Sequence, residues 1–449
     1  NYKKKQWANV VLVNNNSRAN YLNTTGVTVN KDDILAYYVW IPRYSYRIPT
    51  VSCSTISNPT YDDYPSCYSY VLSDNNKTSL INWWQSYAAE NLGSYTLEQA
   101  MQDVNTGMKN GSFTVTGAGE LLFTDMITYY NKQNDPDITY TTEFNSSNNL
   151  LPPGPPREID IVFENKTTAK QNGDAIDTYH THPAFTFGNT ELNGIWIGKF
   201  ETTGSASVPT VKGNNVSLTG QNASTQFATA QKLGTSTYGS TSKVDSHMMK
   251  NSEWGAVAYL SHSKYGTNKE IRINNYYNNG FLTGCGANTE NESSSNTCGI
   301  IYGKAISYPQ STTGNITGIF DMSGGASEYV MGYYSGASTT WGATSSSNYA
   351  GFSSKPASKY FDDYTTDNPL TACNGGICYG HGLSEVNGWY GDYAVFVYAM
   401  APWFERGGDN HDAANAGVFY FNVSSGVAYN AGNASGSYSF RVVLSPIGA

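Results

Sequence analysis

Short apolar runs separated by polar clusters predict that strands form most of this chain's core. Two runs near the N-terminus, residues 7–13 (WANVVLV) and 36–42 (AYYVWIP), are rich in β-branched and aromatic side chains and are bounded by Asn and Pro. Two later runs, residues 158–164 (EIDIVFE) and 194–200 (GIWIGKF), alternate apolar and polar positions with the period of two typical of a strand. We therefore expect a sheet that begins near the N-terminus and resumes in the second third of the chain.

A helical pattern interrupts the strands between these runs. The segment TLEQAMQDV opens with Thr96 and Gln99, whose three-residue spacing is that of a capping box. The segment LPPGPPR at residues 151–157 contains four prolines, which favour extended chain and mark a boundary. The predicted organisation therefore has three parts: the first strands of the core at residues 1–50, an inserted helical subdomain at 51–156, and the rest of the core at 157–449.

Two further helical patterns follow the resumed strands. Residues 223–233 and 252–264 have helical spacing, and Gly266 ends the second pattern. Residues 335–386 are rich in Ser, Gly and Asp and predict a loop-rich insertion. Strands combined with segregated helices indicate an α+β fold.

Composition and charge narrow the classes of partner. Only 14% of the 449 residues are charged and 14% are aromatic, with a formal net charge of −9. A neutral, tyrosine-rich surface suits carbohydrate or protein contacts, although the same composition is typical of a strand-rich protein from an AT-rich genome. The acidic balance argues against nucleic acid and anionic membranes as partners. No apolar run reaches the ~18 residues of a spanning helix.

Six cysteines fall into three couples that are each close in sequence and lie in polar, loop-like segments. Local pairing is the simplest connectivity, and disulfides form in oxidising compartments. Because the chain begins at Asn1 without Met, we expect an exported product, located outside the cell or at its surface, whose signal segment is missing. The expected couples are Cys53 with Cys67, Cys285 with Cys298, and Cys373 with Cys378.

A histidine pair is the one metal-like spacing outside the cysteines. On a strand, His180 and His182 would present both imidazoles on one face, a common arrangement for a metal. No third ligand stands nearby in the sequence. The favoured interpretation is therefore a surface β-bulge before Pro183, in which both histidines are hydrogen-bonded locally.

Three later segments resemble those of formylglycine-generating-enzyme-like proteins: GIFDMSGGASEY at residues 318–329, WFERGG at 403–408 and SFRVVL at 439–444. The resemblance implies a variant C-type-lectin-like core, here with a helical insertion and long loops. It also implies a structural calcium ion at Glu328, with a salt bridge in the core as the alternative. The chain departs from the family at Gly325, where Asn is usual, and at Ser327, where Trp is usual.

The oxidase chemistry of this family requires a reactive cysteine pair between the R-G-G segment and the closing strand. Residues 409–438 contain no cysteine, and the six histidines lack the spacing of a three-histidine iron site. We therefore expect a protein that is not an enzyme.

In lectin-like relatives, the loops in this interval are displayed on the binding face. Asn and Tyr here supply adaptable hydrogen bonds and rigid stacking surfaces, although plain polar strand-and-turn sequence is the alternative. Phrases at residues 37–48 and 248–261 also resemble secreted surface proteins of Gram-positive bacteria. We expect a ligand-binding or adhesive module for a glycan or protein ligand, with a self-assembling subunit of an extracellular filament or surface layer as the alternative. The predicted ligand-binding residues are Trp403, Asn410, His411, Asp412, Asn415, Tyr420, Asn422, Tyr429, Asn430 and Tyr438.

The cysteine pattern gives a direct test. We expect peptide mapping without reduction to find all six cysteines in three local bridges, because each couple encloses a short loop-like segment. Mapping after reduction and alkylation is the control. A free thiol, or Cys53 joined to a cysteine other than Cys67, contradicts the prediction.

Overall fold

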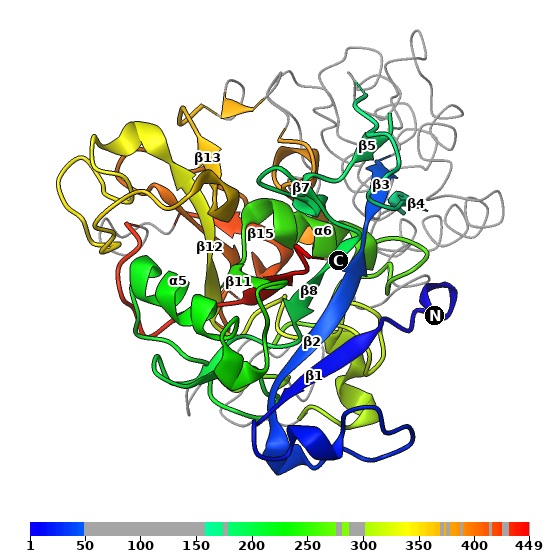
Figure 1. Ribbon diagram of the computed structural model, residues 1–449. Helices are drawn as coiled ribbons and strands as arrows, with labels where there is room; N and C mark the ends of the chain where they lie inside the picture. Colours follow the sequence, from blue (N-terminus) through cyan, green and yellow to red (C-terminus); the bar gives the residue numbers. More distant parts are fainter. Residues whose placement is uncertain are drawn as a thin grey trace, which may run out of the picture. The chain divides into compact units, whose positions relative to one another are not determined.

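A computed structural model gives the fold (Figure 1). The chain divides into two compact units, one formed by Asn1–Ile48, Glu158–Asn387 and Asp392–Ala449 and the other by Pro49–Arg157 with Gly388–Gly391. The first unit is described below, and the predicted helical insertion at residues 51–156 lies outside the described residues. The structure describes residues 1–48, 158–173, 178–274, 281–286, 301–368, 372–373, 378–386, 389–412, 415–423 and 431–448.

Sheets with few helices form the described part of the first unit, in line with an α+β or mainly β class. One five-stranded antiparallel sheet gathers strands from both ends and the middle of the chain. The strands predicted at residues 36–42 and 194–200 are neighbours in this sheet, whereas the alternating run at 158–164 forms β4 (Asp160–Phe163) in a smaller sheet. In spatial order the strands are β1 (Asn9–Val13), β2 (Ile34–Pro42), β8 (Gly194–Gly198), β17 (Val442–Ser445) and β11 (Asp245–Met248).

A second sheet brings together the three segments that carry the family resemblance. β12 lies within this sheet and pairs with β13 and β16 in parallel and with β14 antiparallel, while β15 extends β14. Every residue of β14 and β15 is buried. The strands are β12 (Ser327–Tyr334), β13 (Asp362–Tyr364), β14 (Trp403–Gly407), β15 (Gly417–Asn422) and β16 (Tyr438–Phe440). The segment predicted as a loop-rich insertion, 335–386, thus supplies one edge strand, β13.

Smaller sheets and short helices complete the described unit. The small sheets have the orders β4-β3-β5, β10-β9 and β6-β7. Their strands are β3 (Tyr44–Arg47), β4 (Asp160–Phe163), β5 (His180–Thr181), β6 (Thr186–Phe187), β7 (Thr190–Glu191), β9 (Thr203–Gly204) and β10 (Pro209–Thr210). The short 3-10 helices described are η1 (Tyr2–Lys4), η2 (Arg18–Asn20), η3 (Lys31–Asp33), η6 (Pro183–Phe185), η7 (Ser236–Tyr238), η8 (Ala305–Gln310), η9 (Ser335–Ala337), η10 (Ser358–Tyr360), η12 (Ser384–Val386) and, in the second unit, η13 (Trp389–Gly391).

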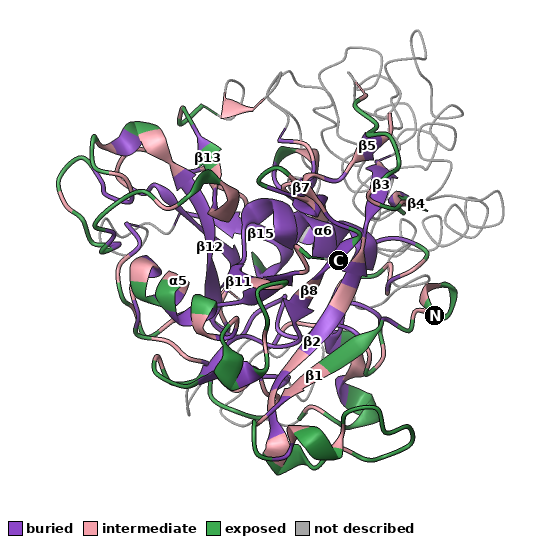
Figure 2. Ribbon diagram, in the orientation of Figure 1, coloured by how far each residue is buried: buried purple, intermediate pink, exposed green. Residues whose placement is uncertain are grey.

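The α-helices α5 and α6 lie at the positions that the sequence predicted. α5 (Ala223–Lys232) is amphipathic and begins at Asn222, whose side chain accepts a hydrogen bond from the backbone N–H of Thr225 at 3.0 Å. α6 (Asn251–Ser261) is buried along its whole length, as Figure 2 shows. A helix surrounded by protein can be apolar or small on every side, which explains the run WGAVAYL.

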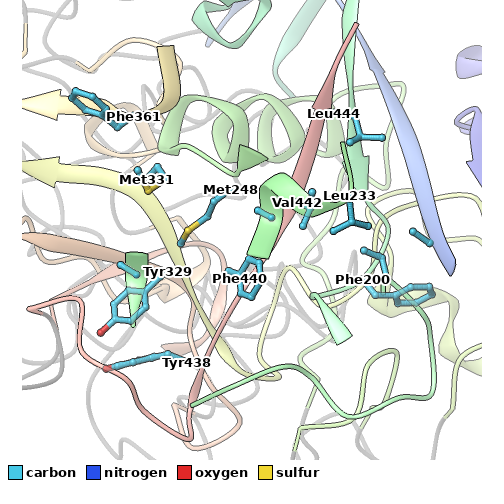
Figure 3. Packing of buried hydrophobic residues seen from close by; sticks show 14 of the residues in the cluster. Phe200, Leu233, Met248, Tyr329, Met331, Phe361, Tyr438, Phe440, Val442 and Leu444 are labelled. Atoms are coloured by element: carbon cyan, nitrogen blue, oxygen red, sulfur yellow. The ribbon is translucent and has the colours of Figure 1, made fainter. Parts of the chain in front are cut away.

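The hydrophobic core joins the two larger sheets and α5. One cluster contains side chains of β2, β11, β12, β16 and β17 together with Phe200, which follows β8 in the chain. Figure 3 shows Tyr329 and Tyr438 together beside Phe440. The Tyr329 and Tyr438 rings lie 4.6 Å apart. The core therefore depends on segments that are far apart in the sequence.

The three resembling segments meet at a buried charge pair. Glu328 pairs in register with Arg406 on β14 and with Ser439 on β16. Both oxygens of the Glu328 carboxylate accept hydrogen bonds from Arg441, one of them at 3.2 Å, and neither residue is exposed. Arg441 also donates to the carbonyl oxygens of Gly198 at 2.9 Å and Asp321 at 3.1 Å. The Arg441 guanidinium thus links β8, Asp321 of the segment 318–329, and β12.

Removing either partner of this pair should destabilise the protein strongly. Glu328→Gln or Arg441→Met leaves the other group buried without its opposite charge, so we expect a loss of about 3–5 kcal/mol in the free energy of unfolding. Denaturant titration measures the loss. The double variant, which removes both charges, is the matched control and should be more stable than either single variant. Single variants that unfold at the wild-type denaturant concentration contradict the prediction.

Candidate functional site

The predicted calcium position at Glu328 lies in a cluster of buried carboxylates. Glu201, Asp321 and Glu328 are all buried and interact electrostatically around Arg441. Burial raises the pKa of Asp321 to about 6 and that of Glu328 to about 7, with Arg441 acting in the opposite direction. Burial raises the pKa of Glu201 well above its usual range, and the neighbouring carboxylates add to this shift, so Glu201 keeps its proton.

This geometry supports the salt bridge at Glu328 over the calcium ion. Both Glu328 oxygens are already bonded to Arg441. Across the described ranges, no set of three or more His, Cys, Asp and Glu side chains is arranged to hold a metal ion. The departure from the family at Gly325 has a local reason: its φ is 82°, and a Cβ there would lie 2.4 Å from Glu201 Oε1.

The histidine pair has local partners. His182 accepts a hydrogen bond from the backbone N–H of Ala184 at 3.3 Å and so caps η6. The His180 ring stacks on Tyr379 with centroids 4.0 Å apart. Burial lowers the pKa of His182 well below its usual value, which keeps this imidazole neutral. The local hydrogen bonds match the interpretation favoured from the sequence, but its surface position is wrong, because His180 and His182 are both buried.

The predicted aromatic anchors are in the core, and the expectation that they are displayed for a ligand is wrong for this structure. Trp403 is 0% exposed, Tyr420 1% and Tyr438 6%. Trp403 stacks on Phe352, with centroids 5.7 Å apart and planes 10° apart. The reason is topological: β14, β15 and β16 are covered on both faces, so their aromatic side chains fill the interior.

A buried polar network underlies the segment that follows β14. Asn422 donates to the hydroxyl of Tyr420 at 2.8 Å, and this hydroxyl donates to Glu405 Oε1 at 3.3 Å. Burial raises the pKa of Glu405 to about 8, with Asp412 and Asp409 adding repulsion. Asn422, which the sequence predicted to bind ligand, is thus buried and belongs to this hydrogen-bond network.

The turn between β14 and β15 carries the predicted residues that reach the surface. The backbone N–H of Asp409 donates to Asp412 Oδ2 at 2.8 Å, and that of His411 donates to Asp409 Oδ1 at 2.7 Å. Asn410 is 1% exposed, and its backbone N–H donates to the carbonyl of Gly325 at 3.0 Å. The His411 side chain is 52% exposed. Asp412 is partly exposed and Asn415 exposed, whereas the predicted residues Tyr429 and Asn430 lie outside the described residues.

An aromatic residue that the sequence analysis missed lies beside this turn. Tyr393 is 48% exposed, and its backbone N–H donates to the carbonyl of Asn415 at 3.0 Å. Its carbonyl accepts from the backbone N–H of Phe421 at 3.0 Å, which ties it to β15. It lies outside the interval 409–438, and no pattern in one sequence connects it with that interval. We call Asp409, His411, Asp412, Asn415 and Tyr393 the surface turn.

The cysteines agree with the sequence where they are described. Cys373 and Cys378 form a disulfide, as predicted. Cys285 is disulfide-bonded, while Cys53, Cys67 and Cys298 lie outside the described residues. In the part of the chain that the structure describes, no helix is both long and apolar enough to cross a membrane.

Comparisons with known proteins do not extend the family resemblance. No family model matches the chain, and no curated protein matches it. The lectin-like fold therefore stays a prediction that rests on the resemblance of the three segments.

The buried carboxylate beneath the surface turn should make stability fall as pH rises. Because the folded pKa of Glu405 is about 8, above the usual ~4.3 for glutamate, the folded state keeps a proton that the unfolded chain loses between these values. Ionisation of Glu405 therefore opposes folding as pH rises through this window. We expect Glu405→Gln to lose less stability than wild type between pH about 5 and about 8, measured by thermal melting.

Glu158→Gln is the matched control, because Glu158 is exposed and accepts a hydrogen bond only at the surface from Asn268. It should keep the wild-type pH dependence. Equal pH profiles for Glu405→Gln and wild type contradict the assignment.

Proposed function

We propose that this protein is a non-catalytic extracellular surface protein whose lectin-like module binds a glycan or protein ligand through the surface turn. The observation that carries this proposal is the contrast in exposure between the surface turn and the buried strands β14 and β15 that it connects. Exposed His411, Asn415 and Tyr393 lie directly above strands that are buried on both faces. A polar turn on a rigid base presents its side chains in one arrangement.

The turn's own hydrogen bonds support this role. Asp409 and Asp412 are engaged with backbone N–H groups of the turn, so they fix its shape. The backbone of Tyr393 is bonded on both sides, to Asn415 and Phe421. Fixing these groups before binding reduces the entropy that a ligand contact must offset.

The chemistry of the exposed groups suits recognition by hydrogen bonds and stacking. His411 and Asn415 offer polar atoms, Asp412 offers a carboxylate, and Tyr393 offers a ring with a hydroxyl at its end. The absence of cysteine from residues 409–438 supports a binding role over oxidase chemistry. The Cys373–Cys378 disulfide supports an oxidising, extracellular location.

One observation favours the alternative, a structural subunit of a filament or surface layer. β1 is at the edge of the five-stranded sheet and pairs with β2. Its residues Asn9 and Val10 are exposed, and Val10 is 36% exposed. An apolar edge strand offers unpaired backbone groups to a strand of another copy.

Variants at the two surfaces separate the proposals. We expect the triple variant Tyr393→Ala/His411→Ala/Asn415→Ala to bind a glycan array or cell surface at least about tenfold more weakly, since a binding surface concentrates its energy in a few contacts. Its melting temperature should stay near wild type, because these side chains are exposed. Labelled protein on the array and on whole cells gives the measurement.

Val10→Lys is the matched control. It places a charge on the edge strand, so it should leave ligand binding unchanged and block strand addition. Negative-stain imaging shows whether wild type forms polymer. If the triple variant binds as wild type does while Val10→Lys abolishes polymer, the structural-subunit proposal replaces the binding proposal.

A further inference from the structure

Two tryptophans lie side by side on the outward face of the five-stranded sheet. Trp40 of β2 and Trp196 of β8 are directly opposite in register, with ring centroids 4.9 Å apart and planes tilted by 54°. Both are partly exposed, whereas Ile41, Ile195 and Ile197 beside them are fully buried. The sheet therefore buries its isoleucines and presents the indoles outward.

The indoles form the floor of a surface hollow of about 480 Å³. This volume falls in the range of small-molecule binding sites. Polar side chains, Pro446 and the apolar residues Ala8 and Leu192 complete its walls. We call this site the tryptophan hollow; it is lined by Trp40, Trp196, Lys166, Glu191, Asn193 and Pro446.

The floor is held in place by a close approach between strands. A Cβ at Gly194 would lie 2.4 Å from Cζ2 of Trp40, so the indole lies against the bare backbone of β8. Cross-strand pairing and this glycine contact would by themselves explain a structural tryptophan pair. They do not explain the hollow above the pair or the polar groups around it.

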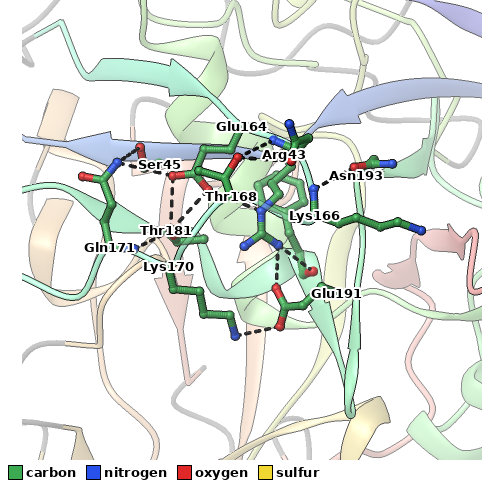
Figure 4. Close-up of polar contacts among 12 residues, drawn as sticks. Arg43, Ser45, Glu164, Lys166, Thr168, Lys170, Gln171, Thr181, Glu191 and Asn193 are labelled. Atoms are coloured by element: carbon green, nitrogen blue, oxygen red, sulfur yellow. Dashed lines mark hydrogen bonds and ion pairs between the residues drawn. The ribbon is translucent and has the colours of Figure 1, made fainter.

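Those polar groups are oriented by their own contacts, as Figure 4 shows for Glu191 between Arg43 and Lys170. Glu191 is 2.7 Å from Arg43 Nη1 and 2.7 Å from Lys170 Nζ, so its charge is already balanced. Hydrogen bonds from Lys170, Arg43 and Thr186 lower the pKa of Glu191 although burial opposes them, and the carboxylate stays ionised. Asn193 Oδ1 accepts from the backbone N–H of Lys166 at 2.8 Å, which leaves the amide nitrogen as the group to offer a ligand.

We propose that the tryptophan hollow binds a neutral hexose ring of an oligosaccharide. A pyranose has an apolar C–H face that fits against an indole and an edge of hydroxyls that fits beside an amide and a carboxylate. The balanced charge of Glu191 favours a neutral ligand over an anionic one. This site is built on β2 and β8 and does not depend on the surface turn, so it stands independently of the proposed function.

Titration calorimetry with four neutral hexaoses, based on glucose in β- and α-linkage, mannose and N-acetylglucosamine, tests the proposal. We expect at least one to bind the wild-type protein. Trp196→Ala should weaken that binding by about tenfold or more. Trp196→Phe, which keeps a ring on the floor, should retain part of the affinity, and Asn193→Ala should weaken binding with little effect on the fold because Asn193 is exposed.

Glu158→Gln is the matched control, because Glu158 is exposed and belongs neither to the tryptophan hollow nor to the surface turn, so it should leave hexaose binding unchanged. Thermal melting of each variant separates a lost contact from a lost fold. Unchanged affinity in both Trp196→Ala and Asn193→Ala overturns the proposal. So does a wild-type protein that binds none of the four hexaoses, or one that binds only an anionic oligomer such as oligogalacturonate.

Discussion

The buried ion pair between Glu328 and Arg441 is the constraint on which the two larger sheets depend. Arg441 lies between β16, which belongs to the second sheet, and β17, which belongs to the first, so the chain passes from one sheet to the other at this residue. Removing a carboxylate and a guanidinium from water is costly unless their hydrogen-bonding capacity is used. The carbonyls of Gly198 and Asp321 accept two further hydrogen bonds from the Arg441 guanidinium, which fixes β8 and the segment 318–329 at the same point.

A second buried arginine, Arg406 of β14, also ties several elements together. Arg406 donates to the carbonyls of His381 and Gly382 and to Asn251 Oδ1, and its guanidinium lies 5.4 Å from the centre of the Trp254 ring. Helix α6 and the loop after Cys378 are thereby tied to β14. Arg406 of the segment 403–408 and Arg441 of the segment 439–444 both bond to buried protein groups, so these two segments help to hold the fold together.

The sequence patterns predicted the positions of strands and helices better than they predicted which side chains are exposed. An apolar, β-branched run located β2, alternation located β8, and helical spacing located α5 and α6, because each signal depends on which side chains of one element are covered. The run GVFYFN of β15 was different: it contains Tyr420 and Asn422, whose residue types are common on binding surfaces, yet its nearly continuous apolar character is that of a strand buried on both faces. The residue types of Tyr420 and Asn422 led to the prediction that they lie at the surface, but both are buried because β15 is covered on both faces.

The same limit explains why Trp40 and Trp196 carried no signal in the sequence. They are far apart along the chain, and only the register of β2 with β8 places them opposite each other. A side chain on a strand is fixed by the pleat and its neighbours, so such a pair is arranged before any ligand arrives. The surface turn achieves its order differently, through backbone hydrogen bonds to Asp409 and Asp412. The tryptophan pair presents an apolar face and the surface turn presents polar groups, so the two surfaces suit different classes of contact.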